Sequence, residues 1–115
     1  MSRNIAFENN VLYIGNVEHT LPEKIDRVEQ DCENVYVLLD IPTRKDLTYD
    51  DYHNVYCFSI TGEKRWQIGI RPRGDESVYT MIGFDNTWVY ANDFLGRRYF
   101  VDKKTGSVMK MIVTK

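Results

Sequence analysis

The residues best suited to acid–base chemistry lie together at Asp50-Asp51-Tyr52-His53, where two carboxylates precede a phenol and an imidazole. Histidine titrates near neutral pH and a neighbouring carboxylate can orient its ring, so the cluster could act as a general acid or base. The alternative interpretation is a solvated acidic loop whose charges only repel or screen one another. A small hydrolase or transferase centred on His53, with Asp50 or Asp51, therefore stays open as one hypothesis.

Other patterns that carry chemistry are missing from the sequence. The two histidines, His19 and His53, are far apart in sequence, and no Cys-x-x-Cys or His-x-x-x-His spacing of zinc sites occurs. Neither a nucleophile elbow nor a glycine-rich phosphate loop is present. We therefore expect no metal and no cofactor. Because the sequence carries no secretion signal and no membrane-spanning run, we expect a cytoplasmic protein with reduced cysteines.

A nucleic-acid interpretation would use arginines for phosphates and aromatic rings for stacking. The candidate arginines flank predicted strands that carry Trp66 and Tyr99; they are Arg71, Arg73, Arg97 and Arg98. The isoelectric point of about 5.6 and the lack of a nucleic-acid-binding motif weigh against this interpretation. Pairing of these arginines with nearby carboxylates on the surface is the favoured alternative.

The acidic cluster belongs to a longer polar segment that suits protein binding better than catalysis. Tyrosine is common at interfaces because it offers a large area and a hydroxyl group at low entropic cost. Residues 1–60 carry eleven acidic and five basic residues, a net charge of −6, whereas residues 61–115 carry a net charge of +4. We therefore expect a basic protein partner. The predicted partner-binding residues are Asp46, Tyr49, Asp50, Asp51, Tyr52 and His53.

The elements around this segment are predicted to be strands. Asn9-Asn10 separates two short apolar runs, which predicts an N-terminal hairpin, and residues 17–21 are a candidate third strand. Residues 24–31 fit either a strand or a helical turn, and their short length favours a strand. The continuous apolar run Asn34–Leu39 predicts a central strand covered on both faces. Residues 41–53 show no periodicity and predict a long loop, and the rest of the chain predicts strands near 55–60, 64–70, 78–82, 87–91, 98–101 and 108–113.

A weak internal repeat organises these strands. The segment that begins at Phe58 and contains Thr61-Gly62 recurs 44 positions later, from Asp102 through Thr105-Gly106. Such a period is typical of four-stranded propeller blades. The segment from Val55 to Trp66 resembles the quinoprotein-like β-propeller repeat, in which an Asp, a Thr-Gly turn and a Trp recur. The first copy has Phe58 in place of the Asp, and the second has Lys110 in place of the Trp.

The resemblance implies two degenerate blades, residues 34–70 and 78–113, and a quinone in a central channel. Propellers close with four to eight blades, which 115 residues cannot supply, so we expect no closed propeller and no quinone. A fragment of a longer propeller is a further alternative. The sequence thus predicts one all-β domain, residues 1–115, built as an antiparallel meander of nine to ten strands. We expect a non-catalytic protein-binding module, a monomer or weak homodimer, whose most concrete form is an immunity-type inhibitor of a basic toxin or nuclease.

Overall fold

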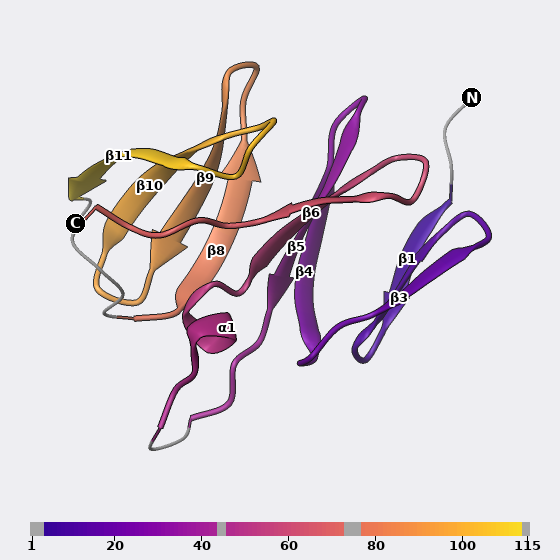
Figure 1. The fold of residues 1–115 in the computed structure, drawn as a ribbon, viewed down its shortest axis with the longest axis horizontal. Helices are drawn as coiled ribbons and strands as arrows, with labels where there is room; N and C mark the ends of the chain where they lie inside the picture. Colours follow the sequence, from indigo (N-terminus) through magenta and orange to yellow (C-terminus); the bar gives the residue numbers. More distant parts are fainter. Residues whose placement is uncertain (1–3, 44–45, 73–76, 114–115) are drawn as a thin grey trace.

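A computed structural model describes residues 4–43, 46–72 and 77–113, and its architecture is all-β with one short helix (Figure 1). The strands form three separate antiparallel sheets, and within each sheet neighbours in sequence pair with each other. The first sheet contains β1 (Ile5–Glu8), β2 (Val11–Ile14) and β3 (Val17–Thr20). The middle sheet contains β4 (Ile25–Gln30), β5 (Asn34–Leu39), β6 (Val55–Ser59) and β7 (Lys64–Gln67). The last sheet contains β8 (Tyr79–Phe84), β9 (Trp88–Asp93), β10 (Arg97–Asp102) and β11 (Val108–Val113).

This arrangement confirms the predicted antiparallel meander, which closes into neither a barrel nor a propeller. The described residues contain eleven strands rather than nine or ten, because the N-terminal hairpin continues into β3. The segment 24–31, which fitted either a strand or a helical turn, forms β4. Strand β7 ends at Gln67, three residues earlier than predicted.

The middle sheet is covered on both faces, as the apolar run in β5 predicts. Alternate side chains of a strand point to opposite faces, so β5 contributes to two cores. Val35 and Val37 pack with Leu12 and Ile14 of the first sheet. Their neighbours on β5 point the other way, into a second core shared with the last sheet. The members of β5 in that second core are Tyr36 and Leu38.

Both Thr-Gly turns place their glycine against a neighbouring sheet. Gly62 has a φ of 105° and Gly106 a φ of 77°, a left-handed region that suits glycine, as predicted for hairpin turns. A Cβ on Gly62 would lie 2.8 Å from Val17 of the first sheet, and a Cβ on Gly106 would lie 2.7 Å from the ring of Trp66. Trp66 is buried against the last sheet, and its indole Nε1 donates a hydrogen bond to the Lys103 carbonyl at 2.8 Å. These contacts join the three layers.

The predicted loop 41–53 differs from the structure, because Tyr49–Tyr52 forms a short helix, α1. Thr48 caps this helix. Its hydroxyl accepts a hydrogen bond from the Asp51 amide at 3.3 Å, and the Asp51 carboxylate accepts one from the Thr48 amide at 2.9 Å. This reciprocal capping pair satisfies amide groups that a helix start leaves free. The prediction of an irregular loop was therefore wrong at Tyr49–Tyr52.

Candidate functional site

The predicted partner-binding residues divide into a buried set, which packs beneath α1, and an exposed set, which lies on α1 and in the segment before it. Asp51 is buried and forms the capping pair with Thr48. His53 is fully buried, and Tyr52 is half-buried. Asp46, Tyr49 and Asp50 are exposed, and the side chain of Tyr49 is 59% accessible. The structure thus retains three of the six residues as surface groups.

His53 packs against the first residue of α1. Its Nδ1 lies 2.6 Å from the Tyr49 carbonyl oxygen, and because a carbonyl can only accept, Nδ1 carries the proton and donates it. The imidazole also stacks on the Tyr49 ring with centroids 3.9 Å apart and an angle of 21° between the planes. These two contacts fix the Tyr49 ring on the surface of the helix.

Two side chains from beyond β6 attach α1 to the sheets. Gln67 on β7 donates through Nε2 to the His53 carbonyl at 2.9 Å and to Asp50 Oδ1 at 3.2 Å. Arg71 is buried, and its guanidinium donates to the Tyr52 carbonyl at 3.3 Å. The same guanidinium lies over the Tyr79 ring, 4.1 Å from its centroid. A four-residue helix is too short to be stable alone, so these contacts to the sheets must hold it.

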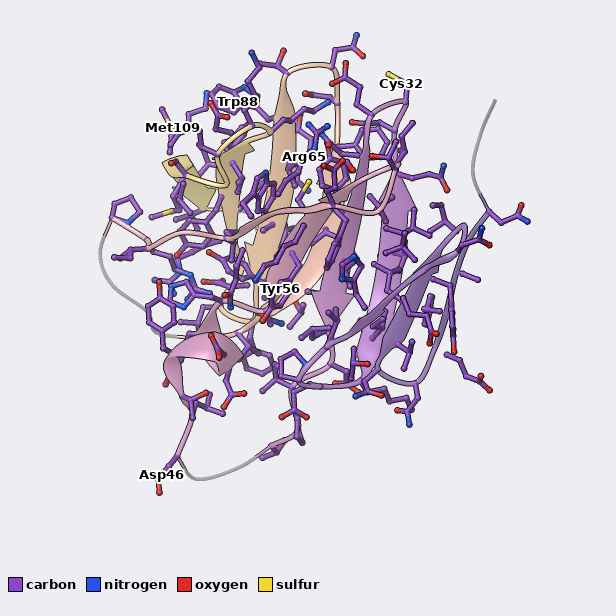
Figure 2. All side chains as sticks on the ribbon, turned by 45° about the vertical axis from the view of Figure 1, so that its right-hand side comes forward. Cys32, Asp46, Tyr56, Arg65, Trp88 and Met109 are labelled. Carbon is purple, nitrogen blue, oxygen red and sulfur yellow. The ribbon has the colours of Figure 1, made fainter. Side chains whose placement is uncertain are left out.

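An apolar hollow of about 260 Å³ is lined in part by Leu47, which lies in sequence between Asp46 and Tyr49 of the exposed set. Phe94, in the turn between β9 and β10, lines it and is 77% accessible. Ser77 also lines it, and its hydroxyl has no hydrogen-bond partner in the part of the chain that the structure describes. The other lining residues are Ile41, Pro42, Thr43, Leu47 and Val78. Figure 2 shows Asp46 at the far end of the connecting segment, away from the sheets.

A larger cleft of about 410 Å³ opens at the opposite end of the middle sheet. Turns of the middle and last sheets line it with residues of both charges, including Asp31 and Lys103, whose carboxylate and ammonium groups are 3.3 Å apart. Burial raises the pKa of Asp31, but hydrogen bonds from the Glu33 amide, Tyr36 and other donors outweigh it and lower that pKa. The carboxylate is thus committed to contacts within the protein. Cys32 lies exposed in this cleft (Figure 2).

The nucleic-acid surface considered from the sequence is not assembled. Trp66 and Tyr99 are buried in the core between the middle and last sheets, so neither ring can stack on a base. Arg71 is buried, and Arg97 pairs with Asp93 at 2.8 Å. Arg73 lies outside the described residues. This interpretation was wrong because strand alternation places both rings on the covered face.

Sequence reasoning missed the hollow and its exposed aromatic residue. Phe94-Leu95 stands inside the turn Asp93–Gly96, where polar residues are usual, and an apolar pair at such a position is a signal of surface function. The capping pattern Thr48-x-x-Asp51 was equally readable. In contrast, the hollow brings Ile41 and Leu47 together with Phe94, about 50 positions away in sequence. No local pattern predicts this contact.

The family model for a domain of unknown function, DUF7957, matches residues 2–112. The chain belongs to this family. A search of curated proteins finds no match. Among the described residues, no helix is long and apolar enough to cross a membrane, and no group of three or more potential ligands could hold a metal ion. Family membership therefore leaves function to be argued from the geometry of the surface.

Proposed function

We propose that this chain is a non-catalytic protein-binding module that acts in the cytoplasm as an immunity-type inhibitor of a basic toxin or nuclease. The observation that carries the proposal is the apolar hollow of about 260 Å³, which is lined by the exposed Phe94 and by Leu47, a close neighbour in sequence of the exposed Asp46, Tyr49 and Asp50. An apolar centre with a polar rim is the usual anatomy of a protein interface. An apolar side chain of the partner would enter the hollow, and its basic residues would face the two carboxylates.

The support beneath α1 suits an interface that is formed before binding. The stacked His53 ring and the capping pair fix Tyr49 without help from a partner. An aromatic side chain that is already ordered loses little conformational freedom when it binds, so more of its contact energy appears as affinity. Tyr49 is therefore the expected anchor of the interface, and Phe94 is the second.

The position of His53 supports binding rather than catalysis. Its ring is fully buried and its Nδ1 donates a hydrogen bond to a backbone carbonyl, so the imidazole does not face solvent where a substrate would bind. The hydrolase or transferase alternative depended on an accessible His53. No second function is proposed, because the arrangement favours none.

The test uses the protein encoded by the neighbouring reading frame, since an inhibitor is expected to be encoded beside its target. Association is measured by biolayer interferometry at low and high salt, with the double variant Asp46→Lys/Asp50→Lys. We expect the on-rate to fall by about tenfold in the variant and to lose most of its salt dependence, because exposed charges steer encounter. Tyr49→Ala should instead raise the off-rate by roughly 5- to 150-fold, the equivalent of about 1–3 kcal/mol.

The matched control reverses two exposed carboxylates at the opposite end of the middle sheet, Glu33 and Glu63. Glu33→Lys/Glu63→Lys makes the same change in net charge and should leave most of the on-rate intact. Equal losses in the two double variants would show that only net charge matters. Unchanged binding by both Tyr49→Ala and Phe94→Ala would contradict the proposed surface.

A further inference from the structure

The outer face of the last sheet carries an aromatic cluster that no part of the described chain covers. Side chains alternate along β9 and β10, so Val89 and Val101 enter the core while their neighbours point outward. Trp88, Tyr90 and Phe100 lie on this outer face, and each is half-buried. Figure 2 shows Trp88 at the edge of the molecule, on the far side of the last sheet from the first sheet.

The three rings are packed into one ordered patch. Phe100 meets Tyr90 edge to face with centroids 5.2 Å apart and meets Trp88 in the same manner at 6.2 Å. Lys110 places its ammonium 4.6 Å from the Phe100 centroid, and Arg98 places its guanidinium 5.1 Å from the Tyr90 centroid. Met81 and Ile112, on the flanking strands, are exposed beside them.

The two cations of this patch are not neutralised within it. Arg98 donates one hydrogen bond, to the Asn92 amide oxygen at 3.0 Å, and neither Arg98 nor Lys110 forms an ion pair within the described ranges. The carboxylates of Asp85 and Asp102 lie at one end of the face. Both already accept hydrogen bonds from amides of their own turns, and Asp85 also accepts one from Tyr90. The face therefore presents two cations over apolar rings, Arg98 and Lys110, with two charged carboxylates at one end.

The outer face of the first sheet has the complementary character. Leu12 and Ile14 point into the core, so the residues that alternate with them point away from it. The cross-strand pairs place Glu18 beside Tyr13, and Glu8 beside Val11. Both glutamates are exposed, and Tyr13 and Val11 are half-buried. This face carries two negative charges around a smaller apolar centre.

We propose that the outer face of the last sheet binds the outer face of the first sheet of a second copy of this chain. Arg98 and Lys110 of one copy then face Glu8 and Glu18 of the other, and the aromatic patch covers Tyr13 and Val11. Residues 4–20, which form the first sheet, carry two acidic residues and no Lys or Arg, whereas residues 77–113, which form the last sheet, carry five basic and three acidic residues; the two sheets lie at opposite ends of the stack (Figure 1). Opposite charges at the two ends of one molecule favour head-to-tail association.

Two copies can satisfy both faces of both chains. A head-to-tail contact either closes into a ring or extends as a filament. Rings of radially arranged sheets close with four to eight sheets. Each copy supplies three sheets, so two copies supply six, which lies within this range. The expected assembly is thus a closed pair held by two equivalent contacts, on faces separate from the hollow beside α1.

A single-stranded nucleic acid is the competing occupant, since aromatic rings with adjacent cations also bind stacked bases. Only two available cations lie on the patch, and the chain carries a formal net charge of −2. Nucleic-acid affinity depends on many phosphate contacts, whereas the acidic face of the first sheet matches these two cations in number. A second copy is therefore the better fit.

Reciprocal charge reversal followed by sedimentation velocity tests the contact. The first variant is Arg98→Glu/Lys110→Glu and the second is Glu8→Lys/Glu18→Lys, each measured alone and then as an equimolar mixture. We expect the wild type to form dimers and each variant alone to dimerise at least about tenfold more weakly, because like charges then meet at both contacts. The mixture should recover dimers, since in a mixed pair both contacts again join opposite charges.

The control variant Arg65→Glu/Lys104→Glu reverses two exposed cations that line the cleft away from both faces, and it should dimerise like the wild type. A wild type that stays monomeric at every concentration would overturn the proposal, as would a mixture that does not recover dimers. Growth into filaments would overturn the closed pair. Binding of a labelled oligothymidine by wild type, lost in the first variant, would assign the face to nucleic acid instead.

Discussion

Replacement of Gly106 by alanine tests the contact that joins the middle and last sheets. Gly106 has a φ of 77°, and a Cβ there would lie 2.7 Å from two ring atoms of Trp66. The indole cannot move away freely, because its Nε1 donates to the Lys103 carbonyl at 2.8 Å and its ring is buried. The substitution therefore imposes both a strained backbone and a steric overlap.

The cost follows from these two parts. A left-handed backbone costs a non-glycine residue about 1–2 kcal/mol, and forcing extra atoms into a packed core costs about 1–3 kcal/mol more. We therefore expect Gly106→Ala to lower the free energy of unfolding by about 2–5 kcal/mol, measured by urea denaturation with unchanged slope. Gly83→Ala is the control, because nothing lies within 4 Å of its added Cβ and its backbone is ordinary for a strand. That variant should be neutral or slightly more stable.

A double-mutant cycle separates the two parts. In a Trp66→Ala background the steric overlap disappears, so Gly106→Ala should then cost only the backbone strain of about 1–2 kcal/mol. The same cost in both backgrounds would refute the Trp66–Gly106 contact. A cost for Gly106→Ala no larger than that for Gly83→Ala would refute both parts.

Three further predictions concern the core and the titrating groups. Trp66→Ala should lower the free energy of unfolding by roughly 3–5 kcal/mol in the same urea assay, as for other buried tryptophans, and a loss below 1 kcal/mol would contradict its burial. Burial of the Asp93 carboxylate raises its pKa, but hydrogen bonds from the Arg97 amide and guanidinium have the larger effect, so the pKa is lowered. The ionised carboxylate therefore stabilises the fold above about pH 4, and this stabilisation is lost as pH falls through the folded pKa. Asp93→Asn should therefore flatten the acid limb of stability against pH, and an unchanged limb would exclude this carboxylate as its cause. Burial raises the pKa of the Cys57 thiol to about 12, so Ellman's reagent should label only the exposed Cys32 rapidly in the native protein and both thiols in denaturant.

Local patterns predicted the strands and the turns well. The apolar run of β5, the Asn9-Asn10 turn and the two Thr-Gly turns each depend on a few adjacent residues. The conformation of a strand follows from the alternation of its side chains, and that of a turn from the backbone freedom of Gly and Asn. Both can be read from the residue types in the sequence. Trp66 follows such a Thr-Gly turn, and the structure buries it against the last sheet.

The candidate site was predicted only in part, because burial depends on contacts between distant segments. The prediction of an acidic surface loop holds for three exposed residues, Asp46, Tyr49 and Asp50. Asp51 and His53 are instead buried, where Asp51 caps α1 and His53 bonds to the Tyr49 carbonyl. Loop composition alone cannot distinguish a carboxylate that caps a helix from one that faces solvent. The hollow could not be predicted either, because Phe94 lines it only when the meander of the last sheet has folded.

The resemblance to quinoprotein-like repeats stays a hypothesis. The Thr-Gly turns and four-stranded sheets fit a blade, but each copy lacks one signature residue, and neither sheet belongs to a closed propeller in the described structure. The charge separation between residues 1–60 and 61–115 corresponds only in part to the ends of the sheet stack, because nine of the eleven acidic residues of 1–60 follow the first sheet in sequence.

The most direct measurement of the proposed function is an amide NMR titration of isotope-labelled protein with the product of the neighbouring reading frame. The largest shifts should appear at Leu47, Tyr49, Asp50 and Phe94, around the hollow. Resonances of Glu33 and Glu63, at the opposite end of the middle sheet, should stay in place. Shifts confined to Arg98 and the outer face of the last sheet, with Tyr49 and Phe94 unchanged, would contradict the account.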